Sequence, residues 1–419
     1  MINVTFSKIG GEIIAPPSKS FMQRYVLLSS FIDGSIRIQN PGYSDDDLVS
    51  LSIGKKCGKN IKENNDGIYI SGKFKNPDII DVRESGTSFR LVQGLLASTH
   101  SKTEILLKKS LIGRPMEPLV SALSPHGYIY SRGSDSIYID ASNFKCPDSF
   151  TIDGTISSQF ISSLMFCLAL SKKEDGTVYV RNGLSSEGYI RITEQILEDF
   201  GCHVDIGNEI HVNSIDLRMP ENVKIEGDYS SSAFLIVMGL LLSDEGITVK
   251  NLPAKSMQPD MEILKILERY LRIRKHENTI DVTASKQDVG RISIDVNRTP
   301  DLAPPLSVLG MFSKEGVEIK NPERLRTKES DRLEAIVDLA KETGAVIESE
   351  NDALIIRSGN HAVTKDLPER NDHRIVMAKF IASSMISDRF QINFHGSVNK
   401  SFPEFWKYSE RLGYKIDFK

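Results

Sequence analysis

The chain of 419 residues has few cysteines and no excess of positive charge. Its four cysteines are far apart and form no CxxC pair; they are Cys57, Cys146, Cys167 and Cys202. This spacing argues against a zinc site or a disulfide framework and fits a reducing compartment. The formal net charge of −4 excludes the broad basic field that is typical of nucleic-acid-binding proteins. Any cations with a function must therefore be concentrated locally.

Segments for export or membrane insertion are also missing. The opening MINVTFSKIGGEI lacks the apolar core of a signal peptide. The longest apolar run, AFLIVMGLLL at 233–242, is about half of a membrane span. We therefore expect a soluble, cytoplasmic protein that binds neither membranes nor nucleic acid. A chain of 419 residues with 40% hydrophobic residues is long and apolar enough for two domains, each with its own core.

Apolar helices that open with a polar cluster recur along the chain. The six segments are SKSFMQRYVLLSSF from Ser18, SGTSFRLVQGLLAS from Ser85, SSQFISSLMFCLAL from Ser157, SSSAFLIVMGLLLS from Ser230, DLAPPLSVLGMF from Asp301 and DHRIVMAKFIASSM from Asp372. Successive starts are 67, 72, 73, 71 and 71 residues apart. This regular period indicates six copies of one structural unit.

The rest of each copy repeats as well. A short strand with alternating apolar residues follows the first helix, as in IRIQN and ITVKN, and an amphipathic helix such as DRLEAIVDLAKETG comes next. Short strands such as SIYID and ALIIR close the copy. Each unit is thus roughly βαβαββ, which places the protein in the α/β class. The first helices are apolar nearly all round, so we expect them to lie beneath sheets.

Six units divide naturally into three and three. The break after the third unit falls near residues 223–228, and the opening strand at 2–14 precedes the first polar cluster. We therefore predict a discontinuous lobe of residues 1–17 and 226–419, and a second lobe of residues 18–225. A cleft between lobes is a common place for a small-molecule site.

The polar helix starts have an ordinary structural interpretation, because serine and aspartate cap free backbone N–H groups. Capping accounts for Ser230 and for part of every copy. It does not account for the cations and the amide near other helix starts, which are Lys19, Arg24, Gln159 and Arg374. A cation at a helix N-terminus opposes the helix dipole by up to ~1 kcal/mol, whereas a bound anion is favoured there. These residues therefore favour anion binding.

Further charged residues stand at the starts of the second helices and in nearby loops. They are Arg114 in GRPMEPL, Lys328, Glu329 and Arg332 in RLRTKESDRLEAI, and Lys400 in NKSFPEF. Taken singly, each charge suits a solvated surface. Their shared placement, in a chain without net positive charge, favours one set of residues that binds acidic ligands.

Seven of these segments together resemble a known family. SKSFMQR, SGTSFR, GRPMEPL, SSQF, KESDRL, NDHR and KSFP occur in this order in the 3-phosphoshikimate 1-carboxyvinyltransferase (EPSP synthase) family of enolpyruvyl transferases. The resemblance extends from about residue 16 to 405. It implies a two-lobed, inside-out α/β barrel with six βαβαββ repeats in two pseudo-threefold domains.

The resemblance also implies an activity. The family transfers the enolpyruvyl group of phosphoenolpyruvate to the 5-hydroxyl of shikimate 3-phosphate and releases phosphate, a step toward chorismate and the aromatic amino acids. It uses no organic cofactor and no metal, and it is the target of glyphosate. We expect the same two small-molecule substrates here, and a monomer.

Matching by motif assigns residues to each substrate. The expected phosphoenolpyruvate-binding residues are Lys19, Gly86, Arg114, Gln159, Arg332, Arg374 and Lys400. The expected shikimate 3-phosphate-binding residues are Lys19, Ser20, Arg24, Ser157, Ser158, Gln159, Ser186, Asp301 and Lys328. Asp301 resembles the general base on the 5-hydroxyl, and Glu329 resembles the acid that protonates the methylene carbon, with Lys19 as a third catalytic residue. Taken alone, each has a structural interpretation that would be favoured: Asp301 as a helix cap and Glu329 as a first-turn acid.

The chain departs from the family pattern at several positions. Pro17 replaces the usual glycine of PGSKS, and Glu84 makes the NAGT-like segment ESGT. Arg324 stands where many members have an asparagine. Tyr189 matches in SEGYIRIT, although Glu187 and Gly188 replace the usual lysine and proline before it.

Two alternatives remain at this stage. The sister enzymes transfer the same group to a UDP-linked amino sugar, but they typically use a loop cysteine that the segment around Arg114 lacks. A non-catalytic phosphate-binding or RNA-terminus-processing protein of related fold would not need both Asp301 and Glu329. RNA binding would also require a broader basic surface.

Overall fold

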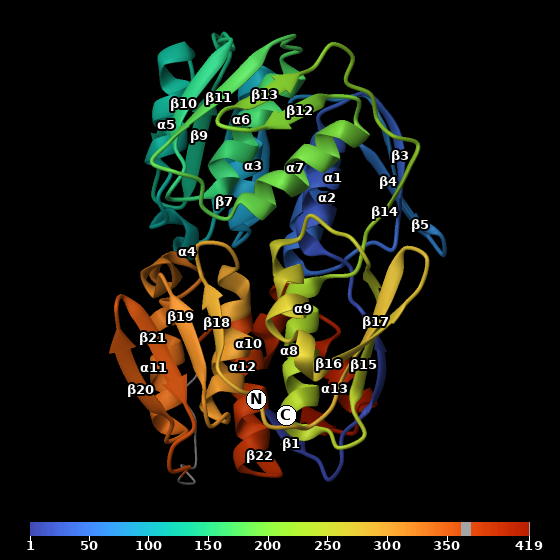
Figure 1. Cartoon of the computed structure of the whole chain (residues 1–419). Helices are drawn as coiled ribbons and strands as arrows, with labels where there is room; N and C mark the ends of the chain where they lie inside the picture. The colour runs from blue at the N-terminus through green and yellow to red at the C-terminus, as the bar shows by residue number, and fades with distance from the viewer. Residues whose placement is uncertain (362–369, 419) are drawn as a thin grey trace. The chain divides into compact units, whose positions relative to one another are not determined.

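The computed structural model describes residues 1–361 and 370–418. Within these residues the chain forms two compact units, one of residues 1–16 and 227–419 and the other of residues 17–226. We call them the discontinuous unit and the continuous unit. Each is described separately below (Figure 1).

The continuous unit contains three four-stranded sheets. Their strand orders are β14(Asn222–Lys224)-β3(Gly34–Gln39)-β5(Gly67–Gly72)-β4(Asn60–Asn64), β6(Ile79–Arg83)-β7(Lys102–Leu107)-β9(Ser136–Asp140)-β8(Ile129–Arg132) and β10(Ser149–Asp153)-β11(Gly176–Arg181)-β13(Ile210–Asn213)-β12(His203–Ile206). In each sheet the first two strands are parallel and the remaining neighbours are antiparallel. One topology is therefore used three times, as the repeat predicted.

The helices of this unit alternate between buried and amphipathic. They are α1(Lys19–Ser30), α2(Asp45–Lys56), α3(Gly86–Ser98), α4(Lys109–Ile112), α5(Glu117–Leu123), η1(Ser124–His126), α6(Ser158–Leu170) and α7(Glu187–Asp199). Helices α1, α3 and α6 are the first helices of their repeats, and nearly every residue in them is buried. The prediction that these helices lie inside is confirmed.

The discontinuous unit repeats the same topology in two of its sheets. These are β2(Gly11–Ile14)-β15(Ile247–Pro253)-β17(Thr279–Ala284)-β16(Leu271–Lys275) and β18(Ile292–Asp295)-β19(Val317–Lys320)-β21(Ala353–Arg357)-β20(Val346–Glu350). In the third sheet the described strands are β22(Arg389–Ile392)-β1(Ile2–Thr5)-β23(Lys415–Phe418), all antiparallel. Strands from both segments of the discontinuous unit thus pair in one sheet.

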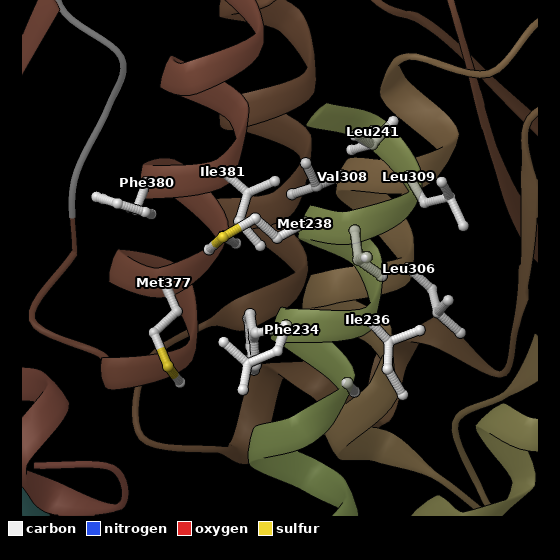
Figure 2. Close-up of a cluster of buried hydrophobic side chains, with 14 of the residues drawn as sticks. Phe234, Ile236, Met238, Leu241, Leu306, Val308, Leu309, Met377, Phe380 and Ile381 are labelled. Carbon is white, nitrogen blue, oxygen red and sulfur yellow. The ribbon is translucent and has the colours of Figure 1, made fainter. Parts of the chain in front are cut away.

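Three buried helices form the centre of the discontinuous unit. The helical segments of this unit are α8(Tyr229–Leu242), η2(Pro259–Met261), α9(Glu262–Ile266), η3(Glu268–Tyr270), η4(Pro300–Leu302), α10(Ala303–Met311), η5(Pro322–Thr327), α11(Arg332–Glu342), α12(His373–Ile386), η6(His395–Lys400) and α13(Phe405–Arg411). Figure 2 shows how α8, α10 and α12 meet through Phe234, Ile236, Met238, Leu306, Val308, Leu309, Met377, Phe380 and Ile381, all of them buried. Each helix is apolar on every side because it has a neighbour on every side.

Capping fixes several helix starts, with one correction to the sequence prediction. Ser85 and Ser157 cap α3 and α6, and Asp372 caps α12, each by accepting a backbone N–H. The predicted capping role of Ser230 is wrong, because α8 begins one residue earlier and Asp228 is its cap, accepting the N–H of Ser231 at 2.6 Å. The hydroxyl of Ser230 instead donates to Asp260. The carboxylate of Asp228, two residues before Ser230, is therefore the acceptor that caps the helix.

Helices α3 and α6 pack so closely at Gly94 that no side chain fits between their backbones. The backbone N–H of Gly94 donates to the Ser163 hydroxyl at 2.9 Å, and a Cβ atom on Gly94 would lie 1.9 Å from the Ser163 carbonyl oxygen. Only glycine fits there without moving a backbone.

We therefore expect Gly94→Ala to lower the stability of the protein by at least about 2 kcal/mol, because overpacking against backbone costs more than helix propensity returns. Urea unfolding followed by circular dichroism measures the effect. Gly207→Ala is the control, since a Cβ atom there meets nothing within 4 Å. Equal midpoints for the two variants would contradict the close contact.

Candidate active site

Arg332 is the centre of the charged cluster in the discontinuous unit. Its side chain is only 1% exposed, yet it contacts three carboxylates. Nη1 lies 3.0 Å from Asp301, Nη2 lies 2.5 Å from Glu329, and Nε lies 2.8 Å from Asp372. Burial opposes its charge, but the three carboxylates outweigh burial and raise the pKa of Arg332. This guanidinium is permanently charged, and its removal would leave buried carboxylates without a counter-charge.

Asp301 lies in η4, at the start of α10, and is held by two arginines. Its Oδ1 accepts from Arg332 and its Oδ2 accepts from Arg374 at 2.8 Å. The helix-cap interpretation of Asp301 is therefore wrong, because no side chain caps η4 or α10. Burial opposes ionisation of the carboxyl, but Arg374, Arg332 and Lys328 outweigh burial and hold the pKa of Asp301 at about 2.

Lys328 and Glu329 occupy the short segment between η5 and α11. Burial lowers the pKa of the Lys328 ammonium to about 8, Asp301 opposes this shift, and Arg332 and Arg324 add to it. The Glu329 carboxylate is 22% exposed, and Arg332 is its partner. Two carboxylates at the surface of one buried guanidinium form a candidate acid–base pair.

Asp372, at the N-terminus of α12, fixes the positions of Arg332 and Arg374. Its side chain is fully buried and accepts from the Nε of Arg332, from the backbone N–H of Arg374 and from the hydroxyl of Ser330 at 3.1 Å. The cap of α12 thus also fixes the two guanidinium groups relative to Asp301. No pattern in the sequence predicted this second role of Asp372.

Lys400 and Arg324 lie in η6 and η5 of the same unit. Lys400 ends η6, which packs against α12. Arg324 donates to the Asn297 carbonyl at 3.1 Å and lines a pocket of about 740 Å³ between η5, α11 and the β20–β21 hairpin. Burial lowers the pKa of Arg324. The arginine that replaces the family asparagine therefore adds positive charge next to Lys328.

In the continuous unit, the first turn of α1 carries Lys19 and Ser20. The Lys19 ammonium lies 2.8 Å from Oδ2 of Asp46, a buried carboxylate in the first turn of α2. The N-cap residue Ser18 makes no side-chain cap. Lys19 therefore opposes the dipole of its own helix but is stabilised by the acid of the next helix.

Arg24 points into the core of this unit. It is 1% exposed and donates to three neutral groups: the Ser20 carbonyl at 2.9 Å, the Thr193 hydroxyl at 2.9 Å and the Tyr189 carbonyl at 3.4 Å. Burial lowers the pKa of Arg24 to about 10. In this arrangement Arg24 joins α1 to α7, and its contact with a ligand stays a prediction.

Gln159 joins the starts of α3 and α6. Its Oε1 accepts from Arg90 at 2.7 Å, and its Nε2 donates to Thr87 at 2.9 Å. The Arg90 guanidinium also lies 5.1 Å from the Phe160 ring centroid. Arg90 belongs to the quoted SGTSFR segment, but its role was missed, because nothing in the sequence links it to a residue 69 positions later.

Gly86 and Arg114 face each other at the start of α3. A Cβ atom on Gly86 would lie 2.8 Å from Nη1 of Arg114. The first backbone N–H groups of α3 and this guanidinium together suit a phosphate or a carboxylate. The remaining predicted serines are Ser157, Ser158 and Ser186; Ser158 and Ser186 are 5% and 4% exposed, and Ser186 begins α7 with a φ of 56°.

Solved structures share this fold. An EPSP synthase from Acinetobacter baumannii superposes with a TM-score of 0.79 at 20% identity, with full coverage of both chains. The enolpyruvyl transferase NikO from Streptomyces tendae gives a TM-score of 0.72 at 15% identity, covering 99% of this chain and 98% of that one. The fold is therefore that of the enolpyruvyl transferases, and the predicted α/β fold class is confirmed.

Sequence comparison defines the family within that fold. The model of the EPSP synthase (3-phosphoshikimate 1-carboxyvinyltransferase) family matches residues 5–408. Relatives named 3-phosphoshikimate 1-carboxyvinyltransferase include one from Picrophilus torridus, 40% identical with 97% of both chains covered, and one from Thermoplasma volcanium, 39% identical with 96% of both covered. The chain belongs to the EPSP synthase family, as its seven motifs predicted. No described helix is long and apolar enough to cross a membrane.

The buried ion pairs of Arg332 lead to a prediction about stability. Arg332→Gln would leave Asp372 as a buried carboxylate without its cation, so we expect a loss of about 3 kcal/mol. The midpoint of urea unfolding measures it.

Arg326→Gln is the matched control. Arg326 belongs to η5 and pairs with Glu323 and Asp331 at the surface, with a side chain 46% exposed, so we expect almost no change. An Arg332 variant as stable as the control would show that the three carboxylates do not depend on this guanidinium.

Proposed function

We propose that the protein transfers the enolpyruvyl group of phosphoenolpyruvate to the 5-hydroxyl of shikimate 3-phosphate and releases phosphate. The observation that carries the proposal is the contact of one buried guanidinium, Arg332, with both Asp301 and Glu329. An addition followed by an elimination needs a base and an acid close together. Family membership over residues 5–408 supplies the substrates.

The proposed chemistry moves the same two protons in both directions. In the addition, Asp301 takes the proton of the 5-hydroxyl, the hydroxyl oxygen bonds to C2 of phosphoenolpyruvate, and Glu329 protonates C3. In the elimination, Glu329 takes a proton back from C3 and the C2–C3 double bond forms again. The bond from C2 to the phosphate oxygen breaks, and the phosphate leaves with the proton that Asp301 held. Atoms and charges balance without an oxidant or a cofactor.

The proposed cations offset the charge of two acidic substrates. Arg332 and Arg374 bind the carboxylate of phosphoenolpyruvate, while the backbone at Gly86, Arg114, Gln159 and Lys400 bind its phosphate. Lys19 contacts both substrates. Shikimate 3-phosphate is held by Ser20, Arg24, Ser157, Ser158, Gln159, Ser186 and Lys328. The paired Gly86 and Arg114 support the phosphate assignment most directly.

We extend the proposal to the setting of the reaction. The protein acts as a monomer in the cytoplasm, with its four cysteines as free thiols. The sister acceptor, a UDP-linked amino sugar, and an RNA terminus are disfavoured by the family match.

The purified protein should release inorganic phosphate only when both phosphoenolpyruvate and shikimate 3-phosphate are present, because the leaving phosphate departs from an adduct of the two. A colorimetric phosphate assay with each substrate omitted in turn checks this. Release from phosphoenolpyruvate alone would contradict the proposed transfer.

Asp301→Ala and Glu329→Gln should each reduce kcat by about a hundredfold or more, given the usual contribution of a general acid or base. Steady-state phosphate release measures both variants. Glu334→Gln is the control, since this exposed acid in the first turn of α11 pairs with Arg370. Wild-type rates in either active-site variant would remove that residue from the mechanism.

A further inference from the structure

The two oxygens of the proposed base are both occupied in this structure. Asp301 Oδ1 is 3.0 Å from Arg332 and Oδ2 is 2.8 Å from Arg374. Together these ion pairs hold the pKa of Asp301 at about 2, against the opposing effect of burial. A carboxylate with this pKa is a poor acceptor for a hydroxyl proton near neutral pH, because an effective base has a pKa closer to the working pH.

The same two arginines are the ones assigned to the carboxylate of phosphoenolpyruvate. The substrate therefore competes with Asp301 for their N–H groups. Arg332 has little freedom to serve both by moving, because its Nε is held by the buried Asp372 and its Nη2 by Glu329. Its Nη1 is the group that Asp301 and an incoming carboxylate would share.

The charge balance of the cluster points in the same direction. The groups that face Asp301 are Arg332 from α11, Arg374 from α12, Lys328 and Glu329 from the segment before α11, and Asp260 from η2. The cluster has as many cations as carboxylates: the cations are Arg332, Arg374 and Lys328, and the carboxylates are Asp301, Glu329 and Asp372. Burial raises the pKa of Asp260 to about 7, so this fourth acid is partly neutral. Another carboxylate makes the cluster more negative and favours the protonated form of Asp301.

We propose that Arg332 and Arg374 form a latch on Asp301 that the substrate carboxylate opens, so that Asp301 becomes an effective base only when phosphoenolpyruvate is bound. This inference rests on the proposed function, in which these arginines bind the carboxylate. The latch prevents the base from taking protons from water or from the acceptor alone. It couples activation of the acceptor to the presence of the donor.

Carboxyl-carbon NMR of the full-length protein, labelled with [4-13C]aspartate, tests the latch. The Asp301 signal is assigned by its loss in Asp301→Asn and is followed from about pH 4 to about pH 8, above the ordinary Asp pKa of ~4. We expect no titration in the ligand-free protein. With saturating phosphoenolpyruvate, monitored by its phosphorus signal, we expect the titration to enter this range, which is a gain in proton affinity of about a hundredfold. An unmoved signal in the saturated complex overturns the latch.

Two simpler ligands separate the carboxylate from the phosphate. Pyruvate carries the carboxylate without the phosphate, and we expect it to move the Asp301 titration in the same direction as phosphoenolpyruvate. Inorganic phosphate alone should leave the titration unchanged. A shift with phosphate and none with pyruvate would show a general effect of added charge and would overturn the latch.

A variant tests the latch without any ligand. Arg374→Gln removes one of the two partners, so Asp301 should titrate at a higher pH in the ligand-free protein. Arg370→Gln is the matched control, because Arg370 precedes α12 and pairs with Asp338 at 2.9 Å instead of Asp301. Identical Asp301 titrations in the two variants would overturn the latch.

The outcomes for the latch and for the proposed function are distinct. Phosphate release from both substrates together with an unmoved Asp301 signal would leave the function standing and reject the latch. An absence of phosphate release would reject the function, while the titration in the phosphoenolpyruvate complex would still decide whether the arginines control the acid.

Discussion

A single buried guanidinium holds much of the discontinuous unit together. Arg332 is 1% exposed and contacts acids from η4, from the loop before α11 and from the N-terminus of α12. Moving one charge out of water is costly unless partners compensate it, so each of these elements depends on the others being in place. The contact that stabilises these elements is thus one of the contacts that lower the pKa of Asp301. Stability and chemistry are not separable at this position.

The buried cation of the continuous unit has partners of a different kind. Arg24 is as buried as Arg332, but it donates to two carbonyls and a hydroxyl. Its positive charge is only partly compensated by these dipoles, and burial lowers its pKa to about 10. Lys19, nearer the surface, has the carboxylate of Asp46 as a direct counter-charge. One unit therefore concentrates opposite charges around one centre, whereas the other distributes its cations among separate partners.

Local patterns in the sequence predicted the fold well, because each repeat carries its own signals. The polar clusters at Ser85, Ser157 and Asp372 mark true helix caps, and the apolar segments that follow are buried helices. The prediction was wrong at Ser230, where two equally good caps lie close together and only the backbone shows which one is used. The pairing of β1 with β22 and β23 was not predicted, because no local pattern shows which distant strands pair.

The sequence predicted the residues of the candidate site individually, but it did not predict which side chains they contact. Lys19 pairs with an acid 27 positions away, Gln159 with an arginine 69 positions away, and Arg332 with an acid 40 positions away. No periodicity links such residues, because the tertiary fold alone brings them together. The motifs predict which residues contact a ligand, and the structure adds the residues that orient them.

The position of β1 has a consequence for synthesis of the protein. This strand precedes the continuous unit in the chain, yet it lies between strands at residues 389–392 and 415–418. The continuous unit, at residues 17–226, is synthesised well before either partner strand. We therefore expect the continuous unit to fold first on the ribosome, while β1 stays unpaired until residues 389–418 have been synthesised.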